Sequence, residues 1–169
     1  MTKNLKLGIM MFLQYAVWGA WMPVTSRFLT ASVMDGGLGF TDSQMAIILG
    51  FAASIGALSA PFIAGQVADR YFSTEKILAF LVISGGLVKW YTALQTDFNA
   101  WLYLSIFYSI LYMPTLALSN SIAFAHLEDS ENNFPKIRAW GTIGWIVATW
   151  TFPMIWLQTD LGFSFMPPF

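Results

Sequence analysis

Five stretches of this chain are apolar and long enough to cross a lipid bilayer, and this feature restricts the possible folds more than any other. The stretches 7–26, 43–68, 98–127 and 139–159 contain no Asp, Glu, Lys or Arg, and the stretch 77–96 contains a single Lys. A helix needs about 20 mostly apolar residues to cross the hydrocarbon layer, and backbone polar groups in lipid must be hydrogen-bonded within their own segment. We therefore expect an all-α membrane protein with helices at about residues 7–30, 43–67, 77–96, 98–126 and 135–158.

The composition argues against soluble and catalytic functions. Hydrophobic residues make up 57% of the chain and charged residues 10%, whereas soluble domains carry about 25% charged residues. The net charge is −1 and the basic residues are scattered, so we expect no nucleic-acid partner. The chain has no Cys and one His, His126, which leaves few ligands or nucleophiles. We expect no catalytic residues, no metal site and no cofactor.

The positive charges are distributed unevenly along the chain. Cytoplasmic loops of membrane proteins carry an excess of Lys and Arg. When the predicted helices cross the bilayer in alternating directions, six of the eight cations fall on the same side of it: Lys3, Lys6, Arg70, Lys76, Lys136 and Arg138. We therefore expect this side, and the N-terminus with it, to be cytoplasmic. Arg27 and Lys89 lie near the opposite side, and we expect their long side chains to extend toward the headgroups.

A charged turn follows the second predicted helix, where Gly65, Asp69 and Arg70 form the pattern G-x-x-x-D-R. This pattern resembles the cytoplasmic loop motif of the major facilitator superfamily. The resemblance implies that the acid and the arginine hold helix ends together on the cytoplasmic side and act in gating. The chain departs from the full motif after Arg70, where Tyr71 replaces the usual glycine. An ordinary charged turn is the alternative interpretation.

A narrower resemblance rests on three stretches: FLQYAVWGAW at 12–21, YMPTLALSN at 112–120 and IRAWGTIGW at 137–145. In this order and at these separations they resemble the nucleoside–proton symporter family within the same superfamily. The resemblance implies a carrier of two six-helix bundles around a midplane site, whose twelve spans need roughly 240 residues. We therefore expect residues 1–169 to be an incomplete N-terminal transmembrane bundle, helices 1–5 of a partial major facilitator fold. The C-terminal helices of the carrier would be missing from a chain that is cut short.

Candidate substrate ligands lie on the fifth predicted helix. Arg138, Thr142, Trp145 and Thr149 follow one another at steps of four, three and four residues, so they share one helix face. The guanidinium of Arg138 offers planar paired donors, Thr142 a directional hydrogen bond and Trp145 a stacking surface for a base. The resemblance implies that these three residues surround the substrate. A positive-inside anchor is the alternative role for Arg138.

Polar and aromatic residues on two other predicted helices are further candidates. Gln14 and Trp18 lie one turn apart on the first helix, and Asn120 lies on the fourth. Buried amides in a membrane need polar partners, so these side chains should face the protein interior. We predict that they contact the substrate, and hydrogen bonding between helices is the alternative. A proton relay through His126 is less favoured than a solvated histidine at the membrane surface.

Every Asp and Glu of the chain falls in or beside a predicted loop. Proton coupling in membranes usually needs a buried carboxylate, so we expect the coupling acid in the missing helices. The resemblance implies proton-coupled nucleoside uptake by alternating access across the bacterial inner membrane, with this chain inactive on its own. Its partners would be a nucleoside, protons, the lipid bilayer and the remaining helices. The alternatives are a carrier for sugars or another polar metabolite, and a non-transporting membrane scaffold or sensor.

Overall fold

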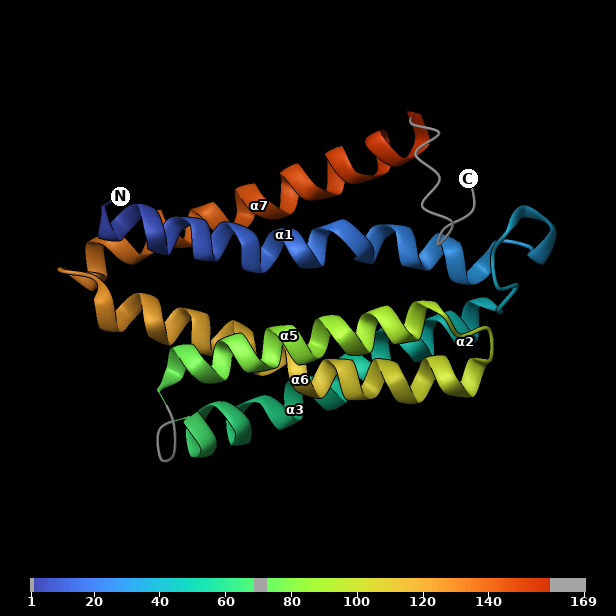
Figure 1. The fold of residues 1–169 in the computed structure, drawn as a ribbon, viewed down its shortest axis with the longest axis horizontal. Coiled ribbons are helices and arrows are strands. Elements are labelled where there is room, and N and C mark those ends of the chain that lie inside the picture. Colours follow the sequence, from blue (N-terminus) through green and yellow to red (C-terminus); the bar gives the residue numbers. More distant parts are fainter. Residues whose placement is uncertain (1, 69–72, 159–169) are drawn as a thin grey trace. The chain divides into compact units, whose positions relative to one another are not determined.

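Helices account for nearly all of the described chain (Figure 1). The computed structural model describes residues 2–68 and 73–158, and this part contains no β-strand. The long helices are α1 (Lys3–Thr30), α5 (Thr74–Ala93), α6 (Phe98–His126) and α7 (Ser130–Gln158). A 3₁₀ turn, η1 (Val33–Asp35), follows α1. The second span combines α2 (Asp42–Ala46), η2 (Ile47–Phe51), α3 (Ala52–Phe62) and η3 (Ile63–Ala68), of which η2 and η3 are π-helical.

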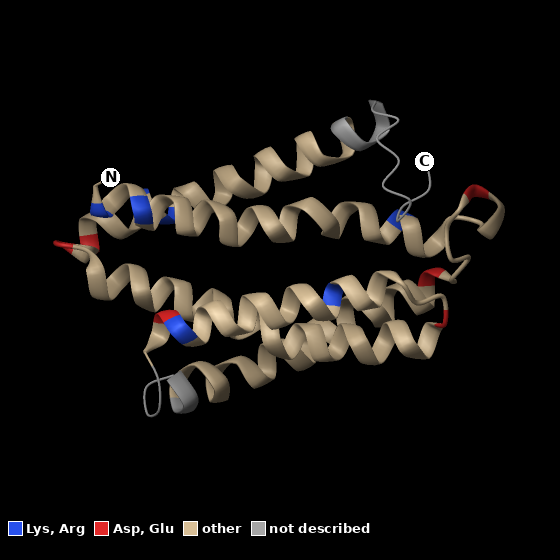
Figure 2. Ribbon diagram, viewed as in Figure 1, with Lys and Arg blue, Asp and Glu red and all other residues tan. Residues whose placement is uncertain are grey.

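Four helical segments of the described chain are long and apolar enough to cross a membrane: Lys3–Thr30, Asp42–Gly65, Thr74–Ala93 and Phe98–His126. Figure 2 shows long uncharged stretches in the helices, with most charges near their ends. The fifth predicted span forms helix α7, of 29 residues, but falls short on hydropathy because tryptophan, threonine and glycine recur along it. That α7 crosses the membrane therefore stays a prediction.

The start of α7 differs from the sequence-based expectation. The hydrophilic residues 130–133 form its first turn, so α7 begins at Ser130 and not at residue 135. Asp129 adopts a left-handed conformation with φ of 51°, which reverses the chain after α6. The side chain of Asn133 donates to the carbonyl of Glu128 over 2.9 Å, and that of Asn132 donates to the Asp129 carboxylate over 2.8 Å. These two asparagine side chains thus supply hydrogen bonds to the turn that precedes α7.

The chain divides into two compact units. The first comprises Met1–Gly37 and Ser119–Phe169, and the second comprises Leu38–Leu118. In the first unit α1 and α7 pack along each other and run in the same direction (Figure 1). Because parallel neighbours present the same helix ends to the same side, residues early in α1 meet residues early in α7.

The second unit packs α3, α5 and the first part of α6. Ile77, Leu81 and Leu118 form its buried apolar cluster. A Cβ built on Gly56 of α3 would lie 2.5 Å from the carbonyl oxygen of Ser109 on α6. Gly56 therefore admits a neighbouring backbone, as close packing in membranes requires.

Lys89 of the second unit does not behave as expected. We expected its ammonium to extend toward the headgroups, but Nζ lies 5.2 Å from the ring centroid of Tyr108 and 5.6 Å from that of Trp101. Aromatic faces attract cations through the ring quadrupole. Because α6 presents two such rings within its own unit, the lysine points to them.

Candidate functional site

The site begins with an unusually close contact between α1 and α7 in the first unit. A Cβ built on Gly19 would lie 2.8 Å from the carbonyl oxygen of Trp145, and one built on Gly144 would overlap the carbonyl of Phe12. A Cβ built on Gly141 would lie 2.7 Å from the side-chain ring of Tyr15. Glycine at these positions lets the two backbones approach within the reach of short side chains. Side chains of α1 and α7 that lie beside these contacts can therefore line a single binding site.

A pocket of about 390 Å³ lies on this face. Both helices contribute to its lining, which consists of Tyr15, Trp18, Met22, Arg138, Thr142 and Trp145. Pockets for small organic ligands usually measure roughly 300–1,000 Å³ and combine aromatic walls with a few polar groups. The size and lining of this pocket fit that class of site.

The side chains that line the pocket restrain one another through direct contacts. The guanidinium carbon of Arg138 lies 4.3 Å from the ring centroid of Tyr15, a cation–π arrangement that restrains the planar group. The rings of Trp18 and Trp145 meet edge to face, with centroids 5.2 Å apart and an interplanar angle of 74°. Aromatic pairs prefer this geometry. A flat ligand would thus meet fixed aromatic surfaces beside a fork of N–H donors.

The predicted ligand residues are not all in one place. The structure brings Arg138, Thr142, Trp145 and Trp18 together in this pocket. Gln14 is buried on α1, with 8% of the residue's surface exposed, but it is not among the residues that line the pocket. Asn120 lies on α6, outside the lining, and its Oδ1 is buried without a hydrogen-bond partner among the described residues.

The predicted gating motif is only partly described. Gly65 is exposed and lies in the π-helical segment η3. Asp69 and Arg70 lie outside the described residues. The gating role of the motif stays a prediction.

The sequence analysis did not select Tyr15 and Met22, which also line the pocket. The signal was present, because Tyr15 lies three residues before Trp18 and Met22 lies four residues after it. Residues three and four apart are neighbours on a helix surface. Choosing Trp18 as a ligand therefore also selects these two side chains.

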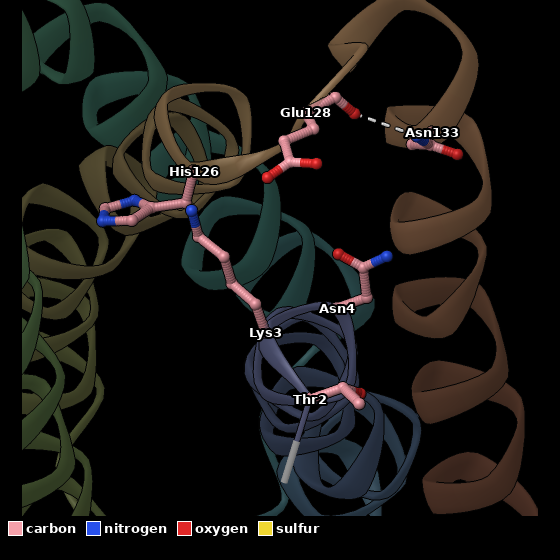
Figure 3. Close-up of a pocket in the computed structure, with 6 residues that line it drawn as sticks. All are labelled: Thr2, Lys3, Asn4, His126, Glu128 and Asn133. Atoms are coloured by element: carbon pink, nitrogen blue, oxygen red, sulfur yellow. Dashed lines mark hydrogen bonds between the residues drawn. The ribbon is translucent and has the colours of Figure 1, made fainter.

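A second pocket of the first unit, of about 290 Å³, lies where α1 begins and α6 ends. Figure 3 shows its lining residues, Thr2, Lys3, Asn4, His126, Glu128 and Asn133. All but Asn133 are exposed. The Nδ1 of His126 lies 2.9 Å from the carbonyl oxygen of Ile122. This pocket is a solvated polar surface, unlike the aromatic pocket between α1 and α7.

Among the described residues, no three or more His, Cys, Asp or Glu side chains are grouped so that they could hold a metal ion. The groups that line the aromatic pocket include aromatic rings, a guanidinium and a hydroxyl.

The fold and the apolar helices define a multi-pass membrane protein with part of a major facilitator fold. The sequence matches the family described as Nucleoside H+ symporter over residues 1–166. The chain belongs to this family.

Individual relatives agree with this assignment. The chain is 40% identical to the protein YegT of Escherichia coli (strain K12) over 88% of its length, and 33% identical to the xanthosine permease of the same organism over 94%. The crystal structure of the nucleoside transporter NupG superposes with a TM-score of 0.77 at 31% identity, over 91% of this chain and 38% of that chain. The chain covers 33% of YegT and 37% of the permease, so it spans about a third of the length of these curated relatives.

Proposed function

We propose that this chain forms helices one to five of a proton-coupled nucleoside carrier, and that the pocket between α1 and α7 is part of its substrate site. The observation that supports the proposal most is the convergence of Arg138, Thr142, Trp145 and Trp18 on one pocket. Family membership and two nucleoside-related relatives support the substrate class. The transport cycle would be alternating access in the cell membrane.

Each lining group has a counterpart on a nucleoside. The base is flat and aromatic, so it can stack on Trp145 or Trp18, and such stacking contributes about 1–3 kcal/mol per base. Base carbonyl oxygens can accept the paired N–H groups of Arg138, whose fork is fixed by Tyr15. The exposed hydroxyl of Thr142 can donate to or accept from a ribose hydroxyl or a base edge.

The orientation and the proton-coupling step are parts of the same proposal. The distribution of Lys and Arg supports a cytoplasmic N-terminus. The described helices hold no acidic residue that lines the aromatic pocket. We therefore assign proton coupling to the part of the carrier that lies outside this chain.

Removing the guanidinium tests the assignment. In cells that express the whole carrier, Arg138→Ala should abolish uptake of labelled uridine while the protein still reaches the membrane. Arg138→Lys should also be impaired strongly, because an ammonium lacks the planar fork. Lys136→Ala is the matched control, since Lys136 is an exposed cation on the same helix, and it should transport normally.

Competition experiments define the substrate class. Unlabelled nucleosides should reduce uridine uptake in the parent protein, whereas monosaccharides should not. Normal uridine uptake by Arg138→Ala would overturn the assigned site. Uptake that sugars inhibit and nucleosides do not would overturn the substrate class.

A further inference from the structure

Pro23 interrupts the hydrogen bonding of α1 at the level of the pocket. In an α-helix each N–H bonds the carbonyl four residues earlier, and proline has no N–H. The carbonyl of Gly19 therefore lacks its usual partner within α1. An unsatisfied carbonyl is costly in lipid, so this oxygen should find a donor on a neighbouring helix.

Thr149 of α7 supplies that donor. Its Oγ1 donates to the carbonyl oxygen of Gly19 over 3.3 Å, which is long for a hydroxyl hydrogen bond. The contact is possible because Gly19 has no Cβ; a Cβ there would lie 3.1 Å from this same Oγ1. Pro153 lies four residues after Thr149, as Pro23 does after Gly19. The contact therefore joins two residues that each lie one turn before a proline of their own helix.

Other threonines of the chain behave differently. The hydroxyls of Thr25, Thr30, Thr92 and Thr151 each donate to the carbonyl four residues earlier in their own helix, over 2.7–3.2 Å. This local bond is the usual choice for threonine in a helix. Thr149 instead donates across the interface between α1 and α7. The difference indicates that the freed carbonyl of Gly19 determines where this hydroxyl points.

The contact lies beside the aromatic wall of the pocket. Gly19 follows Trp18 directly, and Thr149 lies one turn after Trp145. Trp18 and Trp145 are in edge-to-face contact across the same interface. We propose that Thr149 is a positioning residue: its hydroxyl bonds the Gly19 carbonyl freed by Pro23, and this bond holds Trp18 and Trp145 at the spacing that admits a flat ligand. This inference rests on the proposed function of the pocket.

Substitutions at Thr149 test the role of the hydroxyl in the whole carrier. Thr149→Val keeps the shape of the side chain and should raise the KM for uridine about three- to fivefold, the effect of one modest hydrogen bond, with Vmax nearly unchanged. Thr149→Ser retains the donor and should behave like the parent. Thr151→Val is the control, because its hydroxyl bonds its own helix, and its KM should not change.

A double-mutant cycle tests the link to the proline. Pro23→Ala supplies the missing N–H, so the Gly19 carbonyl regains a partner within α1 and the hydroxyl becomes dispensable. Thr149→Val should then have almost no further effect on KM in the Pro23→Ala protein. An equal effect in both backgrounds, a parent-like KM for Thr149→Val, or an equally impaired Thr149→Ser would each overturn the inference.

Thermal unfolding of the four purified proteins of the cycle, without substrate, provides a measurement that does not depend on transport. Thr149→Val should lower the melting temperature of the parent protein more than it lowers that of the Pro23→Ala protein. Absence of this coupling overturns the proposed role of the Gly19–Thr149 contact, whatever the variants' uridine uptake is. If the two substitutions are coupled in melting temperature but the parent protein takes up no nucleoside, the proposed function is overturned. The bond between Thr149 and Gly19 is then only a contact between helices.

Discussion

A cation lies over an aromatic ring in each unit of the chain, and of the two, Arg138 borders the aromatic pocket. In the first unit Arg138 lies over Tyr15 and lines the pocket of about 390 Å³. In the second unit Lys89 lies over Tyr108 and Trp101. The exposed fractions of these two residues are 6% and 3%, so they are part of the unit's interior.

The same contrast holds for the glycines of the two units. Gly144 and Gly56 both admit a neighbouring backbone that a Cβ would displace. Gly144 lies beside the pocket, whereas Gly56 faces the backbone of Ser109 in the unit that holds the apolar cluster of Ile77, Leu81 and Leu118. Close helix packing and charged–aromatic pairs are thus general devices of membrane bundles. A binding site is indicated where they occur next to a pocket lined by polar donors.

Substituting the contact glycines should give the largest change in stability. Gly144→Ala and Gly56→Ala should each destabilise the protein by about 1–3 kcal/mol, because the added methyl group must displace a backbone carbonyl. Gly86→Ala is the control, since a Cβ there meets nothing within 4 Å and alanine favours the helix by about 1 kcal/mol. Thermal unfolding in detergent measures all three.

These glycine variants also sharpen the comparison between the units. Gly144→Ala should raise the KM for uridine, because it separates the helices that form the pocket. Gly56→Ala should lower the melting temperature and leave the KM of the surviving protein near that of the parent. Equal effects of the two variants on KM would remove the distinction between the units.

Removing the cation of the second unit should have the smallest effect. Lys89→Met keeps the length of the side chain but loses a cation–π interaction of about 1 kcal/mol. We expect a slightly lower melting temperature and an unchanged KM for uridine, in contrast to Arg138→Ala. Loss of uridine uptake by Lys89→Met, like the loss expected for Arg138→Ala, would show that Lys89 also acts in substrate handling.

Much of the aromatic pocket follows from helical periodicity. The steps between Arg138, Thr142 and Trp145 place them on one face, and the structure has them in one pocket. The spacing on α7 does not give the rotation of the partner helix α1. Tyr15 and Met22 follow instead from the choice of Trp18, which lies three residues after the one and four residues before the other.

The role of Thr149 shows the same limit. Its spacing places it on the face of Arg138, but its hydroxyl bonds the backbone of α1. A helix face is wide enough to hold both pocket-lining residues and contact residues. The register between α1 and α7 separates the two, and it is set by glycines whose importance appears only when both backbones are placed.

Photolabelling of the whole carrier with radiolabelled 5-azidouridine tests most directly whether nucleosides bind between α1 and α7. The account predicts covalent adducts within residues 15–22 and 138–145 that excess uridine prevents and that Arg138→Ala greatly reduces. Adducts that uridine prevents but that all lie outside these two segments would contradict it.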